Sequence, residues 1–492
     1  MQQNYNTYKD KVNACWIGKN IGGTMGAPYE GSRQMHDIKG FATKPGAIVP
    51  NDDLDLQLVW LYALETIGPY SVNAATLGEF WMSFITPHWN EYGISKANMS
   101  RGLLPPLSGD YENVWKNSNG AWIRTEIWAC VAPGAPEIAS RYAIEDAKVD
   151  HGTGEGTYAA AFVAGMQSAA FVMSDLRECI EVGLSIIPEN SRVAQSVRFV
   201  IDCYDQGKSP IETRNAVLEM NSDIGDGWFE APSNVAYAIL GLLFGEGDFK
   251  KSMILTINCG DDTDCTAATV GATMGILGGM RALPYDWKEH IGDDIITISI
   301  ARGSKGRTLP NTCTALTERV VKMAPPTLLA NKAEMTVSPT DPDDIPGNIK
   351  EILLQNIQKS FRLQDTLKYL KPYSMHFECI MFDAYVTLDK APDIRPLEAC
   401  NIHITFANKR HTHENSPYNL SFRWILPEGF TVENGCSALR LAHETTHAND
   451  YYSDIDFALR AGDNVQPVNK LILEVNVEGR PTVMYIPITL LG

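Results

Sequence analysis

The chain has 492 residues, of which 44% are hydrophobic and 20% are charged. This length and composition exclude a disordered chain and predict a globular protein with a sizeable core, in two domains. The 41 basic and 59 acidic residues leave a net charge of −18. Such a charge repels phosphate backbones and anionic lipid headgroups, so we expect neither a nucleic-acid partner nor a membrane partner.

The amino terminus, MQQNYNTYKDKVNACWIGK, lacks the apolar centre of a secretory signal. No stretch of the chain offers the roughly 20 apolar residues that a membrane span needs. The ten cysteines form no C-x-x-C pair, which is typical of reduced thiols. We therefore expect a cytoplasmic protein, although a secreted or periplasmic protein that has lost its signal peptide would show the same pattern.

The hydrophobic pattern changes along the chain. Residues 1–325 carry helical periodicity, as in LDLQLVWLYALE (54–65) and NVAYAILGLLFG (234–245), and we expect a helical domain there. Residues 326–375 begin with a stretch rich in Pro, Asp and Thr and are expected to form a linker and junction. Residues 376–492 contain short β-branched and aromatic runs between turn signals, which predicts a β-sandwich accessory domain. The predicted fold class is therefore mainly α, with a carboxy-terminal β-sandwich.

Two dense groups of aspartates precede apolar stretches. NCGDDTDCTAATVGA (258–272) places Asp262 and Asp264 where a helix begins, and VPNDDLDLQLVW (49–60) repeats the arrangement. The helix expected after Asp264 carries a stripe of small residues at a spacing of four, from Ala267 to Gly279, which lets a neighbouring helix come close. Aspartates in a first turn also cap helices, so one such group alone leaves capping as an equal alternative. Two helix starts that meet in space would form a strongly negative pocket, which is costly unless cations fill it. Oxygen ligands of this kind select Mg²⁺, Mn²⁺ or Ca²⁺ over zinc.

Five stretches in this order resemble the motifs of the ADP-ribosylglycohydrolase family, of the dinitrogenase reductase-activating glycohydrolase type. They are GTMGAPYEG (23–31), NDDLD (51–55), SNGAWIR (118–124), DAKVDHGTGEGTYAAAF (146–162) and GDDTDCTAATVGA (260–272). The resemblance covers residues 11–324. It implies an all-helical fold with two divalent cations, usually Mg²⁺, in a central cleft, and it does not extend to the β region.

The resemblance also implies which residues bind metal. The candidate ligands at the two helix starts are Asn51, Asp52, Asp53, Asp262, Asp264 and Cys265. Asn51 and Cys265 stand where the family usually has hydroxyl residues. The carbonyl of Asn51 is still a hard oxygen donor, whereas a neutral Cys265 thiol is a poor partner for Mg²⁺. The number of occupied metal sites is therefore open.

Glu30 matches a family glutamate on a mobile segment that handles the attacking water, and we expect Glu30 and Asp53 to be the catalytic residues. Without the resemblance, Glu30 is more simply a surface glutamate in a Gly-Pro loop. Asp55, one turn beyond the ligands, either orients Gln57 or a bound water, or is only a helix charge. The resemblance places a further set of residues at the substrate-binding wall: Asn119, Gly120, Arg124, His151 and Gly152.

These expectations predict a metal-dependent hydrolase that cleaves an N- or O-glycosidic bond of an ADP-ribosyl or related ribose-like substrate. The substrate is either a small molecule or an ADP-ribosylated protein. Divalent cations can bind neighbouring sugar hydroxyls and lower the pKa of a bound water. Carboxylates nearby favour the positive charge that develops on the sugar. The sequence does not indicate the number of subunits in the assembled protein.

Two other classes of function remain open. One is a glycoside hydrolase for a nucleoside, furanoside or glycan, which the added β domain favours by analogy alone. The other is a non-catalytic protein that binds ADP-ribose or a sugar, which Asn51 and Cys265 favour.

Two histidine pairs near the carboxy terminus are weaker signals. HETTH (443–447) has the spacing of a zinc peptidase motif, but it lies among strand signals without an evident third ligand. We expect a turn or loop there. His411 and His413 form an exposed pair that can bind metal adventitiously.

Overall fold

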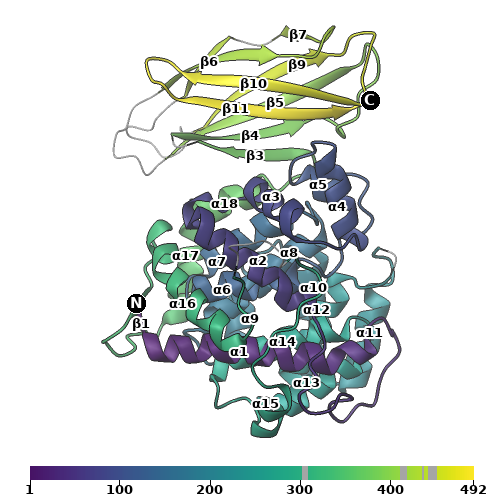
Figure 1. Ribbon diagram of the computed structural model, residues 1–492, viewed down its shortest axis with the longest axis vertical. Helices are drawn as coiled ribbons and strands as arrows, with labels where there is room; N and C mark the ends of the chain where they lie inside the picture. Colours follow the sequence, from purple (N-terminus) through teal and green to yellow (C-terminus); the bar gives the residue numbers. More distant parts are fainter. Residues whose placement is uncertain (226, 302–307, 380, 410–417, 435–436, 442–451) are drawn as a thin grey trace. The chain divides into compact units, whose positions relative to one another are not determined.

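The chain forms two compact units in a computed structural model (Figure 1). The structure describes residues 1–492 except 226, 302–307, 380, 410–417, 435–436 and 442–451. The first unit comprises Met1–Gly93 and Asn113–Thr366, and the second comprises Ile94–Glu112 and Leu367–Gly492. Both histidine pairs, 411–413 and 443–447, lie outside the described residues.

The first unit is helical. Its α-helices and 3-10 helices are α1 Tyr5–Gly26, η1 Ala27–Tyr29, α2 Asp52–Ile67, η2 Pro69–Ser71, α3 Ala74–Phe84, η3 Trp122–Arg124, α6 Glu126–Val131, α7 Pro136–Ala147, α8 Glu155–Ala170, α9 Leu176–Leu184, α10 Arg192–Asp205, α11 Pro210–Met220, α12 Ala231–Phe244, α13 Phe249–Asn258, α14 Thr263–Gly278, α15 Tyr285–Ile291, α16 Cys313–Ala330 and α17 Ile349–Lys359. Helices α4 (Asn90–Ser100) and α18 (Phe361–Lys368) cross the boundaries between the two units. A short parallel pair joins β1 (Gln2–Asn4) to β2 (Thr336–Ser338).

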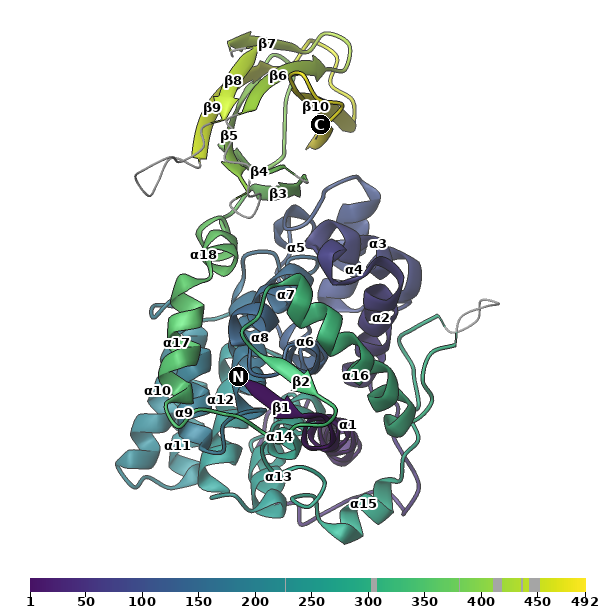
Figure 2. The same ribbon diagram turned by 90° about the vertical axis from the view of Figure 1, so that its left-hand side faces the viewer.

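Helices α1 and α14 lie against each other at the centre of this unit (Figures 1 and 2). Their small residues meet backbone to backbone: a Cβ added at Gly18 would lie 2.2 Å from the carbonyl oxygen of Gly271, and one at Gly22 would lie 2.3 Å from that of Ala267. The stripe of small residues expected on α14 therefore has its partner in α1. This contact fixes the first turn of α14, which carries Asp264, beside the end of α1.

The residues expected to form a linker, 326–375, contain regular elements. Helix α16 continues through Pro325 and Pro326 to Ala330, and α17, α18 and β2 follow. Proline removes a hydrogen bond from a helix interior, but Thr327 and Leu328 are buried and hold this last turn against the unit. Among the described residues, no helix combines the length and hydropathy that a membrane-spanning segment needs.

The second unit contains two antiparallel sheets and the short helix α5 (Leu107–Asp110). The strands are β3 Ser374–Glu378, β4 Phe382–Leu388, β5 Ala399–Asn408, β6 Tyr418–Ile425, β7 Thr431–Asn434, β8 Ala438–Leu441, β9 Tyr452–Arg460, β10 Val468–Val477 and β11 Val483–Leu491. One sheet has the order β3-β4-β5-β9-β7, and the other has the order β11-β10-β6-β8.

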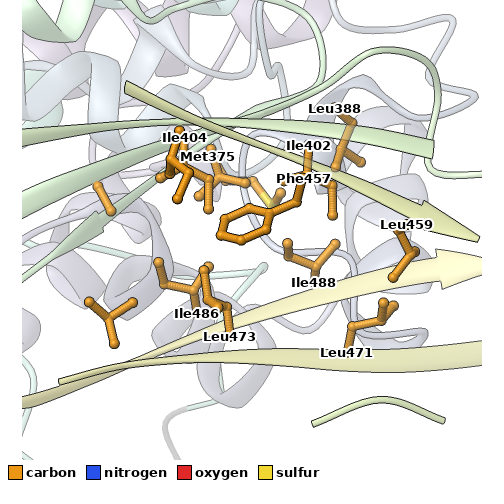
Figure 3. Close-up of a cluster of buried hydrophobic side chains, with 14 of the residues drawn as sticks. Met375, Leu388, Ile402, Ile404, Phe457, Leu459, Leu471, Leu473, Ile486 and Ile488 are labelled. Carbon is orange, nitrogen blue, oxygen red and sulfur yellow. The ribbon is translucent and has the colours of Figure 1, made fainter. Parts of the chain in front are cut away.

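Both sheets contribute alternate residues to one hydrophobic core. Ile404 pairs in register with Ile455 in the first sheet, and Leu471 pairs with Ile488 in the second. Figure 3 shows Ile402 and Phe457 facing Leu473, Ile486 and their neighbours across the space between the sheets. The alternation of buried apolar and exposed residues, with period two, produces this core. The prediction of a helical domain followed by a β-rich region is confirmed.

Candidate active site

Each of the two aspartate groups begins a helix, and a polar residue directly before each helix caps it: Asn51 for α2 and Asp262 for α14. The side chain of Asn51 accepts a hydrogen bond from the N–H of Asp53 at 2.8 Å, and that of Asp262 accepts one from the N–H of Cys265 at 3.4 Å. Capping therefore explains part of the pattern. It leaves the carboxylates of Asp52 and Asp264 without a capping role.

The two helix starts meet in space. Carboxylates from distant parts of the chain line a single cavity of about 650 Å³ in the first unit: Glu30, Asp52, Glu91, Asp262 and Asp264. Asn119, Gly120 and Cys265 also line it. The remaining expected site residues, which are Asn51, Asp53, Arg124, His151 and Gly152, are not among the described residues that line this cavity. The structure thus brings most of the expected metal ligands to one surface and places the others behind it.

Two side chains hold the aspartates in place. The hydroxyl of Tyr92 donates to Oδ2 of Asp52 at 2.9 Å, and the amide of Asn119 donates to Oδ2 of Asp262 at 2.7 Å. Asn119 is itself oriented, because the indole N–H of Trp122 donates to its carbonyl oxygen at 2.8 Å. These contacts fix carboxylate positions before any ligand binds, which is the pre-organisation that metal sites require.

Asp53 lies behind the cavity wall and is fully buried. Its Oδ1 accepts a hydrogen bond from the Cys265 thiol at 3.2 Å, and its Oδ2 lies 3.6 Å from the ammonium of Lys19. Lys19 is also buried and forms an ion pair with Glu126 at 3.1 Å. Asp53 is thus part of an internal charge network that adjoins the cavity.

Glu30 follows η1 and is exposed at the edge of the cavity. The segment after it is held by Asp261: the N–H of Gly31 donates to the Asp261 carbonyl at 2.9 Å, and the N–H of Asp261 donates to the Ser32 carbonyl at 2.8 Å. The Asp261 carboxylate accepts hydrogen bonds from the Phe229 N–H and the Asn234 amide. The first aspartate of the GDDTD stretch, Asp261, therefore positions the backbone beside Glu30.

The crowding of carboxylates raises their pKa values. The negative charge of Asp264, together with partial burial and the charge of Asp52, raises the pKa of Glu30 from 4.5 to about 8. Burial, followed by the charge of Asp264, raises the pKa of Asp52, of Asp262 and, with Lys19 opposing, of Asp53. Burial also raises the pKa of the Cys265 thiol well above its ordinary value, so the thiol is neutral. The site holds more negative charge than the protein alone compensates.

The donor set of the cavity fits a hard divalent cation. Oδ1 of Asp264 is buried and accepts no hydrogen bond from the described residues. Ligand atoms of Asp262, Asp264 and Cys265 lie within 4.8 Å of one another. A buried carboxylate oxygen without a donor is costly unless a cation approaches it. Mg²⁺ and Mn²⁺ match carboxylate ligands of this kind.

Arg124 and His151 support the cavity wall from within the fold. The guanidinium of Arg124 is buried, pairs with Asp146 and Asp150, and donates to the carbonyl of Gly120. His151 lies 3.0 Å from Asp150 and 3.2 Å from the hydroxyl of Ser118. Burial acts to raise the pKa of Asp150, but Arg124 and His151 lower it to about 2. This network fixes the backbone at Ser118 and Gly120, both of which line the cavity.

Gly152 has a positive φ of 53° and accepts a hydrogen bond through its carbonyl from Thr157, so it shapes a buried turn. Asp55 does not orient Gln57; it holds the backbone of Ile298, which lines the cavity. Its Oδ2 accepts hydrogen bonds from the N–H groups of Ile298 and Ser299, at 2.6 and 2.7 Å, because the 298–299 segment crosses the first turn of α2. Gln57 instead donates to Glu126.

Several residues of the cavity carry no obvious signal in the sequence. Tyr92 and Glu91 come from the start of α4, Trp89 precedes it, and Phe229 comes from the loop before α12. Trp89 stacks on Tyr92 with ring centroids 6.2 Å apart. The stretch Trp-Asn-Glu-Tyr (89–92) is rich in aromatic and polar residues, and this composition is the sequence signal that could have marked it as part of a site. Lys19 also had a sequence signal, because it is the one charged residue in the mostly small and apolar run WIGKNIGG (16–23).

Comparisons with known proteins give two similar proteins and one family model. A curated protein of Archaeoglobus fulgidus, named only as an uncharacterised protein, is 24% identical over 298 residues, which cover 58% of this chain and 92% of that protein. A solved structure titled "ADP-ribosylglycohydrolase-related protein complex" is 20% identical, covers 65% of this chain and 99% of its own, and has a TM-score of 0.43. The family model for ADP-ribosylglycohydrolase matches residues 4–321. The chain therefore belongs to the ADP-ribosylglycohydrolase family.

Proposed function

We propose that the chain is a divalent-cation-dependent glycohydrolase that cleaves an N- or O-glycosidic bond of an ADP-ribosyl or related ribose-like substrate by attack of water. The observation that carries this proposal is the convergence of Asp52, Asp262 and Asp264, from two helix starts about 210 residues apart, on one cavity that Glu30 also lines. Family membership supports a glycohydrolase of ADP-ribosyl type.

In this proposal Asp52, Asp262 and Asp264 hold the cation. When bound, a divalent cation supplies a Lewis acid that fixes neighbouring sugar hydroxyls and makes water a better nucleophile. Tyr92 and Asn119 keep two of these carboxylates in one orientation through the hydrogen bonds at 2.9 and 2.7 Å. The protein thus keeps the binding geometry fixed before the sugar arrives.

Glu30 accepts the proton of the attacking water. It lies at the exposed edge of the cavity, where water has access. The charges of Asp264 and Asp52 help to raise its pKa to about 8 in the cation-free chain; a cation held by these aspartates offsets their charge and favours the ionised, basic form of Glu30. Negative charge from the remaining carboxylates stabilises the positive charge that develops on the sugar as the leaving group departs. Glu91, buried on the same wall with a pKa raised by burial, adds to this field in its ionised form.

A second candidate substrate class is a neutral nucleoside or furanoside. Among the described residues that line the cavity, five are carboxylates and none is a lysine or arginine. A diphosphate group would be repelled by such a lining, whereas a neutral leaving group would not. Trp89 and Phe229, both at the cavity, offer rings against which a flat leaving group can lie.

A mass-spectrometric screen for released sugar tests the proposal. Substrates would include peptides ADP-ribosylated on arginine or serine, nucleosides and simple furanosides, each with Mg²⁺ and with EDTA. We expect release that depends on Mg²⁺ and is abolished by Asp264→Ala. Release of ADP-ribose would identify the first substrate class, and release from nucleosides or furanosides alone would identify the second.

The control is Asp286→Ala, which removes an exposed aspartate paired with Lys250 outside the cavity. This variant should match the unmodified chain. Sugar release that survives both EDTA and Asp264→Ala would refute the proposed site. Sugar binding without release on the whole panel would instead support a binding protein.

A further inference from the structure

Lys19 places a positive charge inside the wall of the candidate metal site. Its side chain and that of Asp53 have no exposed surface, and its ammonium lies 3.6 Å from Oδ2 of Asp53. The ammonium donates to the carbonyl of Ile123 at 2.7 Å and to Glu126 at 3.1 Å. The ammonium thus makes two hydrogen bonds, and it faces Asp53 as an opposite charge at a longer distance.

The network behind Lys19 keeps this charge in place. Glu126 is buried, and it accepts hydrogen bonds from the amide of Gln57 at 2.7 Å and from that of Gln167 at 3.3 Å. A buried charge persists only where it is paired and hydrogen-bonded. Glu126 and Asp53 together meet that condition for Lys19, so the ammonium is a fixed part of the wall.

The other oxygen of Asp53 is also engaged by the chain. Cys265 donates its thiol proton to Oδ1 at 3.2 Å, while Oδ2 faces the ammonium and accepts no hydrogen bond from the described residues. Asp53 is therefore held from the protein side, next to a positive charge that it shares with Glu126. It is not among the described residues that line the cavity.

The side chain of Asn51 is also engaged in contacts within the fold. Its side-chain oxygen caps α2 through the N–H of Asp53 at 2.8 Å. Its amide nitrogen occupies the space above Gly23, where a Cβ would lie only 2.0 Å away. Asn51 and Asp53 are two of the six candidate metal ligands, and both make contacts within the fold instead.

We propose that this chain holds one divalent cation, on Asp52, Asp262 and Asp264, and that Lys19 takes the place of a second cation beside Asp53. The inference rests on the proposed function and specifies the cation content of that site. It departs from the pair of cations that the family resemblance implies, because on the Asp53 side of the cluster the Lys19 ammonium and the Cys265 thiol already face the two carboxylate oxygens.

Titration with Mn²⁺ tests the inference without any substrate. Calorimetry and metal analysis of the dialysed protein should give one Mn²⁺ per chain, and its electron paramagnetic resonance spectrum should be that of an isolated ion. Two equivalents with a magnetically coupled spectrum would overturn the inference and leave the proposed function standing. No binding at all would refute the proposed function itself.

The variant that tests Lys19 is K19M/E126Q. It removes the ammonium together with the carboxylate that pairs with it, while glutamine keeps hydrogen-bonding capacity toward Gln57 and Gln167. We expect this variant to bind a second Mn²⁺ at the Asp53 side. One Mn²⁺, as in the unmodified chain, would show that Lys19 does not exclude the second ion.

The matched control is K11M, on the same helix α1. Lys11 donates to the carbonyls of Ala170 and Phe171 and not to the site. Its replacement should leave the stoichiometry at one. Binding of a second Mn²⁺ by K11M would mean that the second ion in K19M/E126Q results from loosening of α1, and it would overturn the role of Lys19.

Discussion

The thiol of Cys265 donates a hydrogen bond to Oδ1 of Asp53 across 3.2 Å, although 212 residues separate the two in the chain. This contact joins the first turn of α14 to the first turn of α2, the two helix starts that create the negative cavity. Burial and the surrounding aspartates keep the thiol neutral by raising its pKa. Cys265 therefore acts here as a hydrogen-bond donor.

Cys265→Ser is expected to preserve or strengthen Mg²⁺ binding, because a serine hydroxyl donates to Asp53 in the same way and is a harder ligand than a thiol. Affinity for Cd²⁺ should fall in the same variant. Calorimetric titration with each metal measures both effects. Cys259→Ser is the control, since that buried thiol donates to the Leu255 carbonyl outside the site. A large loss of Mg²⁺ affinity would show that the sulfur has another role.

Asp264→Ala is expected to abolish Mg²⁺-dependent activity and the stabilisation that Mg²⁺ confers. Oδ1 of Asp264 is the buried oxygen without a donor among the described residues. At a cation concentration of about 100 Kd, binding stabilises a folded protein by about 2.7 kcal/mol, and this increment should vanish in the variant. Thermal unfolding with Mg²⁺ and with EDTA measures it. A variant that kept the increment would place Asp264 outside the site.

Local signals predicted the parts of the site that depend on nearby sequence. The capping residues Asn51 and Asp262 stand directly before apolar stretches, so the starts of α2 and α14 could be located in advance. The small residues of α14, spaced by four, predicted a close helix neighbour, and α1 is that neighbour. Helix starts and the spacing of small residues depend on residues close together in the chain, so a short stretch of sequence is enough to predict them.

Long-range packing determines the rest, and the sequence does not display it. Tyr92 reaches Asp52, and Lys19 reaches Asp53, only because helices far apart in the chain pack together. The assignment of Ile94–Glu112 to the second unit has the same origin: Leu103 and Leu107 are buried in the core of the two sheets. The hydrophobic pattern of residues 94–112 does not indicate which of the two cores this segment joins.

The stability of the cation-free protein should fall as pH rises from about 4.5 to about 8. Glu30 has a pKa of 4.5 as an ordinary group and about 8 in the folded chain, so the folded state retains a proton that the unfolded state releases in this interval. Unfolding in urea with EDTA, at several pH values, measures the slope. Partly buried Glu137, whose pKa is raised by burial to about 7, contributes in the same direction.

The comparison with Glu30→Gln isolates the contribution of Glu30. The variant should show a shallower fall in stability over the same interval, because glutamine does not titrate. Mg²⁺ should flatten the profile of the unmodified chain, since a cation replaces the bound protons. An EDTA profile that rises with pH, or one that Glu30→Gln leaves unchanged, would contradict this account.

Tyr92→Phe is expected to lower cation affinity about 10-fold while leaving the fold intact. The variant keeps the ring contacts with Trp81 and Trp89 but removes the hydroxyl that holds Asp52. Partners of metal ligands typically contribute 10- to 100-fold to affinity. Mn²⁺ calorimetry measures the change, and Tyr285→Phe, at an exposed tyrosine, is the control. Unchanged affinity would mean that Asp52 needs no support from Tyr92.

Gly271→Ala is expected to destabilise the helical unit by about 3 kcal/mol or more, at the upper end of the usual cost of overpacking. Its Cβ would lie 2.1 Å from the backbone oxygen of Gly18, and a backbone cannot yield as a side chain can. Because α14 also positions Asp264, cation affinity should fall with stability. Gly40→Ala is the matched control, since an added Cβ there meets nothing within 4 Å. Urea unfolding measures both variants, and equal stabilities would show that α1 and α14 can separate without cost.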